Sequence, residues 1–263
     1  MTIRDEVEAA VWWFLSRVRA PRARTLNDPD QAAIDQAADR VAAQLLGGAD
    51  AVLTIALAGC SGVGKSTLIN ALAGSAIAET HEKRPCTMRA RAYHYRDVPS
   101  GGLPADLASA LAFATHGRAE LRSKVIVDTP DLDTFATANR AATRAMLKAA
   151  GLVLYVFSPE RYLEKRSWSV IREEGRFSSC LAILNKADTV PADVLDRIAG
   201  ELRDRFAAIG HSEIQILRVV ASRHVPRPDG ALEPTAGDVD EFDRLRDYIE
   251  CELRDGDIAT LVR

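Results

Sequence analysis

Short apolar runs alternate with amphipathic stretches of helical period from residue 51 to residue 253. Six of the runs are rich in β-branched and other apolar residues, which is typical of buried strands. They cover residues 52–58, 88–95, 123–128, 151–157, 179–184 and 214–220. Strands that alternate with helices predict an α/β fold, doubly wound, with a mostly parallel six-stranded sheet.

Two of the intervening helices are clear from their apolar stripes. The stripes consist of Val194, Leu195, Ile198, Leu202, Phe206 and Ile209, and of Phe242, Leu245, Ile249 and Leu253. The segment 96–122 differs, because Pro99, Gly101, Gly102 and Pro104 break any regular element at its start. We expect a loop there, followed by a short alanine-rich helix.

Two further amphipathic stretches precede the alternating region. The first contains Trp12-Trp13-Phe14-Leu15, and the second begins at Asp28-Pro29 and ends before Gly47. The aromatic run is compatible with a membrane anchor, but such a stripe more often packs on a neighbouring helix, which we favour. The chain is therefore expected to consist of an N-terminal helical segment, 1–49, and an α/β domain, 50–263.

Composition excludes several classes of protein. The formal net charge is −3 and hydrophobic residues make up 47% of the chain, so the overall charge favours neither nucleic acid nor anionic membrane as a partner. No apolar run reaches the roughly 18 residues of a membrane span. The four cysteines form no CxxC pair, which argues against a zinc site or a disulfide framework. We expect a soluble cytoplasmic protein with reduced thiols.

The strongest motif follows the first strand. It is a complete GxxxxGK[ST] sequence, and a strand before it and a helix after it are the context of a true phosphate-binding loop. The candidate phosphate-binding residues are Gly59, Ser61, Gly62, Val63, Gly64, Lys65, Ser66 and Thr67. Backbone N–H groups and the helix N-terminus would hold a polyphosphate, Lys65 would reach its β and γ phosphates, and Ser66 would bind Mg²⁺.

A second motif, Asn185-Lys186-Ala187-Asp188, follows the fifth predicted strand. A carboxylate at Asp188 can accept from both the ring N–H and the exocyclic amine of guanine, a pair of donors that adenine does not present. Asn185 is expected to tie this loop to the phosphate loop, and the stem of Lys186 to lie across the purine. The two motifs predict that GTP and GDP are the ligands.

In order, the motifs GCSGVGKSTLINALAG, RPCT, DTPD, NKAD and VVASR resemble those of translation-factor-related GTPases, in the branch with Era-like and bacterial dynamin-like proteins. The resemblance covers about residues 50–255 and is greatest to bacterial dynamin-like GTPases. It implies that Thr87 closes on Mg²⁺ and the γ phosphate and that Asp128 holds Mg²⁺ through water. It also implies that Ser222 and Arg223 offer backbone N–H groups to guanine.

Two positions depart from the family pattern. Asp131 replaces the glycine of DxxG, and we expect its charge to point away from the phosphates. Leu132 replaces the glutamine that orients water in small GTPases, so intrinsic hydrolysis should be slow. Arg84 and Arg89, beside Thr87, are candidates to add positive charge, although arginines in such a loop are more often solvated, which we favour.

Three functions remain open from the sequence. The first is a dynamin-like GTPase activated by a nucleotide-dependent homodimer, acting at a membrane through regions outside this chain. The second is an Era-like GTPase associated with RNA or the ribosome. The third is a scaffold that binds GTP with negligible turnover. In each, the catalytic candidates are Lys65, Thr87 and Asp128 and the metal candidates are Ser66, Thr87 and Asp128.

Overall fold

The structure, a computed structural model, describes residues 52–79, 90–98, 111–133, 137–174, 179–226 and 239–253. The chain divides into two compact units, and all described residues belong to one of them, Val52–Leu253. The helical pair predicted for residues 1–49 lies outside the described residues. The division between residues 49 and 50 therefore stays a prediction.

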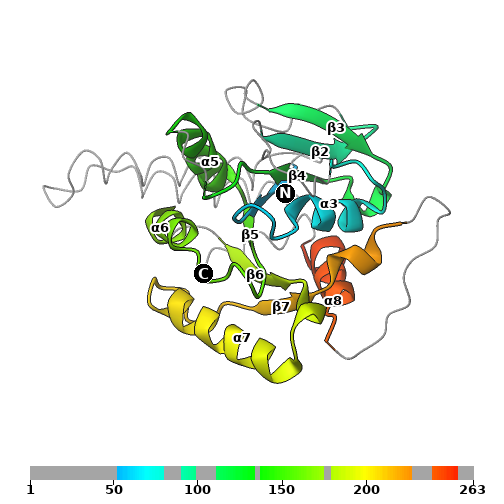
Figure 1. Ribbon diagram of the computed structural model, residues 1–263. Helices are drawn as coiled ribbons and strands as arrows, with labels where there is room; N and C mark the ends of the chain where they lie inside the picture. The colour runs from blue at the N-terminus through cyan, green and yellow to red at the C-terminus, as the bar shows by residue number, and fades with distance from the viewer. Residues whose placement is uncertain are drawn as a thin grey trace, which may run out of the picture. The chain divides into compact units, whose positions relative to one another are not determined.

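Seven strands form one sheet in the order β3-β2-β4-β1-β5-β6-β7 (Figure 1). They are β1 (Leu53–Ala58), β2 (Arg91–Tyr95), β3 (Ala112–His116), β4 (Lys124–Asp128), β5 (Leu152–Phe157), β6 (Cys180–Asn185) and β7 (Ile216–Val219). The five strands from β4 to β7 along this order are parallel. The pair β2–β4 is antiparallel and β2–β3 is parallel. The predicted α/β class with a mostly parallel sheet is confirmed.

The count of six strands was wrong, because β3 lies within the segment expected to be a loop and a helix. Its backbone pairs with β2 from Arg91↔Ala112 to Tyr95↔His116. β3 lies at the edge of the sheet, and most of its side chains are exposed or half-buried, with Phe113 38% exposed. An exposed edge strand lacks the apolar run by which buried strands are recognised. Residues 99–110 of that segment lie outside the described residues.

Helices flank the sheet. They are α3 (Lys65–Ala73), α5 (Thr137–Ala149), α6 (Lys165–Glu174), α7 (Ala192–Ala207) and α8 (Phe242–Asp247), which continues as a π-helical turn, η6 (Tyr248–Glu252). Three short 3₁₀ turns are η2 (Ala119–Leu121), η4 (Ala187–Thr189) and η5 (Ala221–His224). In Figure 1, α5, α6 and α7 lie on one side of the sheet and α3 and α8 on the other. The helices expected near residues 194–209 and 242–253 are confirmed.

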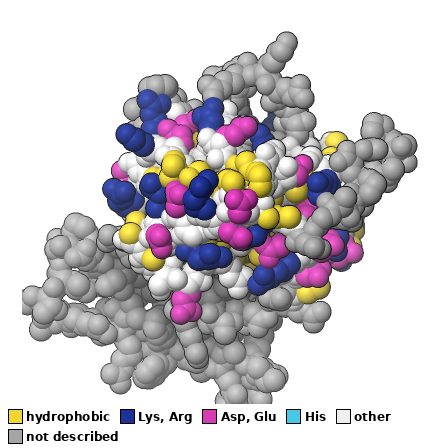
Figure 2. Space-filling view, turned by 60° about the horizontal axis from the view of Figure 1, so that its bottom comes forward, with side chains coloured by type: hydrophobic (Ala, Val, Ile, Leu, Met, Phe, Trp, Pro, Cys, Tyr) yellow, Lys and Arg dark blue, Asp and Glu magenta, His cyan; other side chains and the backbone are white. Residues whose placement is uncertain are grey.

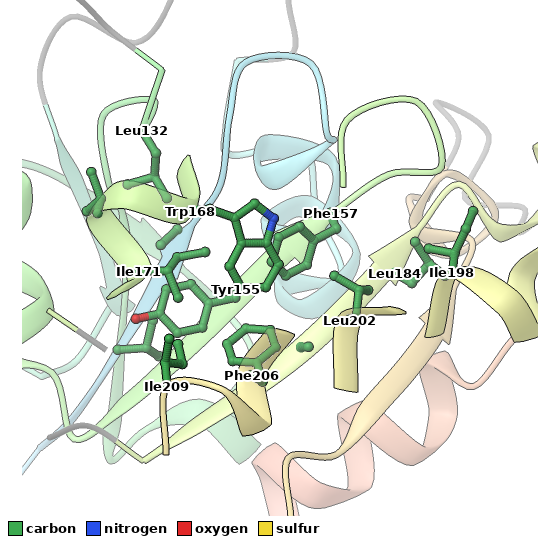
Figure 3. Close-up of a cluster of buried hydrophobic side chains, with 14 of the residues drawn as sticks. Leu132, Tyr155, Phe157, Trp168, Ile171, Leu184, Ile198, Leu202, Phe206 and Ile209 are labelled. Carbon is green, nitrogen blue, oxygen red and sulfur yellow. The ribbon is translucent and has the colours of Figure 1, made fainter. Parts of the chain in front are cut away.

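An aromatic cluster fills the core between the sheet and α6 and α7 (Figure 3). Trp168 stacks on Phe157 with ring centroids 5.6 Å apart, and Phe206 meets Trp168 edge-on at 5.1 Å. Tyr155 lies beside Phe206, with centroids 5.7 Å apart. Tyr155, Phe157, Trp168 and Phe206 are thus packed as core residues. The core fixes β5 and β6, whose C-terminal ends lead into the site.

Surface charge is mixed where it can be seen. On the face in Figure 2, cationic and anionic side chains alternate among apolar ones, so the described part of this face carries no extended region of one sign. Within the described ranges, none of the helices combines the length and the apolar content that crossing a bilayer requires.

Candidate functional site

The phosphate-loop motif connects β1 to α3. Gly62 and Gly64 have φ of 81° and 92°, in the left-handed region that suits glycine. Gly64 stands at the N-cap of α3 and has no side chain with which to cap the helix. The first N–H groups of α3 are therefore available to an external acceptor, and the helix dipole favours an anion there.

Close packing explains two of the glycines. A Cβ at Gly59 would lie 2.4 Å from the carbonyl oxygen of Val156, at the end of β5. A Cβ at Gly64 would lie 2.3 Å from Nδ2 of Asn185. Both distances are too short for any side chain, so the loop can lie against β5 and β6 only with glycine at these positions.

Asn185, the last residue of β6, joins two loops of the site. Its Nδ2 donates to the carbonyl oxygen of Val63 (2.9 Å), and its Oδ1 accepts from the N–H of Ala221 (3.1 Å). The amide is buried, so both bonds are shielded from water. The prediction that Asn185 ties its loop to the phosphate loop is confirmed, and the amide also fixes the start of η5.

The remaining NKxD residues follow Asn185 at the same edge of the sheet. Lys186 has φ of 58°, which turns the chain into η4, and Asp188 is 39% exposed. Arg223 of η5 places its Nη2 3.9 Å from Oδ2 of Asp188, and Ser222 beside it is exposed. The structure thus brings Asp188, Ser222 and Arg223 together, although their contacts with guanine stay predictions.

Sequence reasoning missed Asp240, which holds η5 in place. Its Oδ1 accepts from the N–H groups of Val220 (3.1 Å) and Phe242 (3.2 Å), and its Oδ2 lies 2.8 Å from Nε2 of His224. The imidazole of His224 also stacks on the ring of Phe242, with centroids 4.0 Å apart. The only signal in the sequence was an aspartate two residues before an apolar helical stripe, which is typical of a helix cap.

Asp128, at the end of β4, faces the start of α3. Its Oδ2 accepts from Oγ of Ser66 (3.4 Å), and its Oδ1 is buried with no hydrogen-bond partner among the described residues. Burial raises the pKa of Asp128 to about 6, against the opposing effect of the Lys65 ammonium. A buried, unpartnered carboxylate oxygen beside a serine hydroxyl fits the oxygen chemistry that Mg²⁺ prefers.

The ammonium of Lys65 is bound by groups of the protein itself. Its ammonium donates to the carbonyl oxygens of Gly59 (3.0 Å) and Cys60 (3.3 Å) and to Oδ1 of Asp131 (2.6 Å). The expectation that Asp131 points away from the phosphate site was wrong. Lys65 is buried, with only 6% of its side chain exposed, and a buried cation needs a counter-ion.

Asp133 makes a second contact with the phosphate loop that the sequence did not reveal. Its Oδ1 accepts from the backbone N–H of Ser61 (3.0 Å). Arg161 lies 3.8 Å from Oδ2 of Asp133, and Arg166 of α6 donates to its carbonyl oxygen (3.3 Å). Asp133 therefore links the phosphate loop to the segment that leads into α6.

Other predicted site residues lie outside the described residues. They are Thr87, the metal and catalytic candidate, and the two arginines beside it, Arg84 and Arg89. Gly59, Val63 and Thr67 are placed in the loop and at the start of α3, as their positions in the motif require.

A shallow hollow of about 550 Å³ lies at the other end of α3, around Gly74, Arg96, His116 and Arg118. Arg118 is paired there with Glu250, whose Oε1 lies 2.6 Å from its Nε. Because the C-terminus of a helix carries partial negative charge, this hollow does not reproduce the anion-binding setting of the phosphate loop.

Residues 54–186, about half of the chain, match the family described as 50S ribosome-binding GTPases. This match covers the phosphate loop, the DTPD sequence and the first two residues of NKAD. No curated protein sequence matches the chain.

Several solved structures share the fold. A bacterial dynamin from an oligomerised pair that senses and tethers membranes has a TM-score of 0.62 at 14% identity, over 100% of this chain and 54% of that one. Era from Aquifex aeolicus has a TM-score of 0.52 at 18% identity, over 78% and 58%. Toc33 from Arabidopsis thaliana has a TM-score of 0.52 at 16% identity, over 85% of this chain and 93% of that one. The chain spans little more than half the length of the dynamin and Era chains.

Proposed function

Because the chain belongs to the family of 50S ribosome-binding GTPases, we propose that it is a Mg²⁺-dependent switch that binds GTP and hydrolyses it to GDP and phosphate. One observation carries the proposal furthest. The amide of Asn185 hydrogen-bonds Val63 of the phosphate loop and Ala221 of η5, so the elements that we propose for phosphate and for base are held together.

The base end of the site suits guanine. Asp188 is exposed enough to accept from the ring N–H and the exocyclic amine, and these charge-assisted bonds select GTP over ATP. The backbone N–H groups of Ser222 and Arg223 would meet the guanine oxygen, and Lys186 would cover the ring. In the structure Arg223 faces Asp188, so we expect guanine to take over part of that interaction.

The phosphate end supplies charge and position. Lys65, the N–H groups of the loop and the N-terminus of α3 would neutralise and orient the phosphates for in-line attack by water. Mg²⁺ would be held by Ser66, by Thr87 and, through water, by Asp128, and would add charge neutralisation at the β and γ phosphates. The unpartnered oxygen of Asp128 supports this assignment.

Intrinsic turnover is proposed to be slow. Leu132 is one of the buried residues of the hydrophobic cluster in Figure 3, and its backbone N–H donates to the carbonyl oxygen of Gly59 (3.2 Å). A buried alkyl group cannot order an attacking water. We propose that the group that orders this water comes from residues outside the described ranges or from a partner, which can also add positive charge.

The partner that we propose is a second copy of this domain, as in a dynamin-like mechanism. The likeness to a bacterial dynamin that is described as oligomerised supports this branch. A two-fold dimer over the nucleotide face would order the switch residues of both copies at once. We place the protein in the cytoplasm, with any membrane contact made by regions outside this chain, and favour no nucleic acid as partner.

Sedimentation of the protein with GDP and with GDP–aluminium fluoride tests the self-association. We expect a monomer with GDP, a dimer with the transition-state mimic, and GTP turnover per molecule that rises with protein concentration. A monomer in both states with concentration-independent turnover would contradict the dimer. If turnover then rose with ribosomal RNA, an Era-like function would replace the dynamin-like one, and binding without turnover would indicate a GTP-gated scaffold.

A further inference from the structure

Lys65 is fully occupied by groups of the protein itself. An ammonium has three N–H donors, and those of Lys65 have three acceptors: the carbonyl oxygens of Gly59 and Cys60 and the Oδ1 of Asp131. Only Asp131 carries a charge. Its side chain is 8% exposed, so the ion pair is shielded from solvent and little weakened by it.

The two residues that follow Asp131 are anchored to the same loop. Leu132 donates its N–H to the carbonyl oxygen of Gly59, and its side chain is 3% exposed in the core. Asp133 accepts from the N–H of Ser61. Asp131 is therefore held over the phosphate loop by its neighbours as well as by its own contact with Lys65.

A bound nucleotide has to compete for Lys65. The lysine of such a loop reaches both the β and the γ phosphate. A diphosphate ends at the β phosphate, so Lys65 can bridge that phosphate and the carboxylate of Asp131 as a cation between two anions. A triphosphate adds a γ phosphate, which must approach the same ammonium. The γ phosphate and the carboxylate of Asp131 are both negative, and like charges confined to a buried site repel strongly.

We propose that Asp131 is a specificity-determining residue that weakens triphosphate binding more than diphosphate binding, because the γ phosphate must displace its carboxylate from Lys65. The inference rests on the proposed function, since it concerns the same nucleotide site. Without nucleotide, the carboxylate of Asp131 binds Lys65 in the place that a phosphate would take. GTP binding then requires the segment 131–133 to rearrange, which couples the γ phosphate to a change of shape.

Asp131→Asn tests the proposal, because asparagine keeps the size of the side chain and removes its charge. Calorimetric titrations with Mg²⁺ would measure the Kd of GDP and of the non-hydrolysable imido analogue of GTP for the parent and the variant. We expect the ratio of the two Kd values to shift toward the triphosphate by about tenfold, the factor expected from one charge-assisted contact. Asp131→Gly should shift it in the same direction. Asp204→Asn, on the exposed face of α7, should leave it unchanged.

An unchanged ratio in both Asp131 variants, or an equal gain for both nucleotides, would overturn the proposal. Loss of GDP binding in both variants would overturn it too, because the carboxylate would then be needed to position Lys65. Nucleotide binding by the parent protein distinguishes a failure of the role of Asp131 from a failure of the proposed GTPase function. If the parent bound neither nucleotide, the proposed GTPase function itself would fail, whereas normal binding with an unchanged ratio rejects only the role of Asp131.

Discussion

Asn185 and Val63 lie 122 positions apart in the chain and are joined by a hydrogen bond of 2.9 Å from the asparagine amide to the valine carbonyl oxygen. The same amide accepts from the N–H of Ala221. One buried side chain thus holds the phosphate loop, the end of β6 and the start of η5 together. Its position sets the distance between the elements proposed for base and phosphate.

Asn185→Ala should destabilise the fold and weaken nucleotide binding together. The variant leaves the carbonyl of Val63 and the N–H of Ala221 without partners in a buried place, and each costs about 1–3 kcal/mol. Asn185→Asp is a second test: it keeps the acceptor for Ala221, loses the donor for Val63 and places a buried carboxylate beside that carbonyl, so it should also destabilise the fold. Urea denaturation would measure both losses of unfolding free energy. Equal stability of parent and Asn185→Ala would contradict the bridging role.

Asp188→Asn should reverse the preference for the base. The amide can no longer accept two hydrogen bonds from guanine, so GTP affinity should fall by about 2 kcal/mol or more, and affinity for xanthosine triphosphate should rise. Competition binding with the two nucleotides measures the exchange. Asp193→Asn, an exposed change in the first turn of α7, is the control. If GTP bound the Asp188 variant as tightly as the parent, guanine recognition would lie elsewhere.

Leu132→Ala should affect stability and leave the chemistry intact. The side chain is buried in the hydrophobic core, so truncation should cost about 2–5 kcal/mol of unfolding free energy. Leucine makes no polar contact with water, so GTP turnover per folded molecule should stay near that of the parent. Thermal denaturation and phosphate release, measured at a temperature where the variant is folded, test both halves. A loss of turnover in a folded Leu132→Ala protein would show that the catalytic groups have been assigned to the wrong residues.

Stability should fall at acid pH through His116. Burial lowers the pKa of this imidazole to about 4 from an ordinary value near 6.5, and the Nε2 is buried with no hydrogen-bond partner among the described residues. Between those pH values the unfolded chain binds more protons at this residue than the folded chain, so unfolding free energy decreases as pH falls from about 6.5 to about 4. His116→Gln should flatten that slope in urea denaturation at a series of pH values. An unchanged slope would contradict a neutral His116.

Most of the fold could be predicted from the sequence because its strands are buried on both faces. β1, β4 and β5 are entirely buried, and such strands appear as continuous apolar runs. The edge strand β3 could not be found in this way, since its stability comes from pairing with β2 and not from a local pattern. Similarly, GxxxxGK[ST] and NKxD identified residues that the structure brings together at the C-terminal ends of the parallel strands β1 and β6.

The contacts of Asp131 and Asp133 could not be predicted, because they depend on distances between segments that are far apart in the sequence. Asp131 was expected to avoid the phosphate site on the ground of its charge. When no nucleotide is bound, however, the buried ammonium of Lys65 needs another anion, and Asp131 supplies it. Asp131, which replaces the glycine of DxxG, is in this way the basis of the proposed discrimination between GDP and GTP.

The decisive measurement for the proposed GTPase activity is the rate of phosphate release from GTP and from ATP, with and without Mg²⁺. We expect release from GTP that requires Mg²⁺, negligible release from ATP, and none from GTP in Lys65→Ala, while Lys148→Ala in the last turn of α5 behaves as the parent. Equal rates with ATP and GTP, or release that survives in Lys65→Ala, would contradict it.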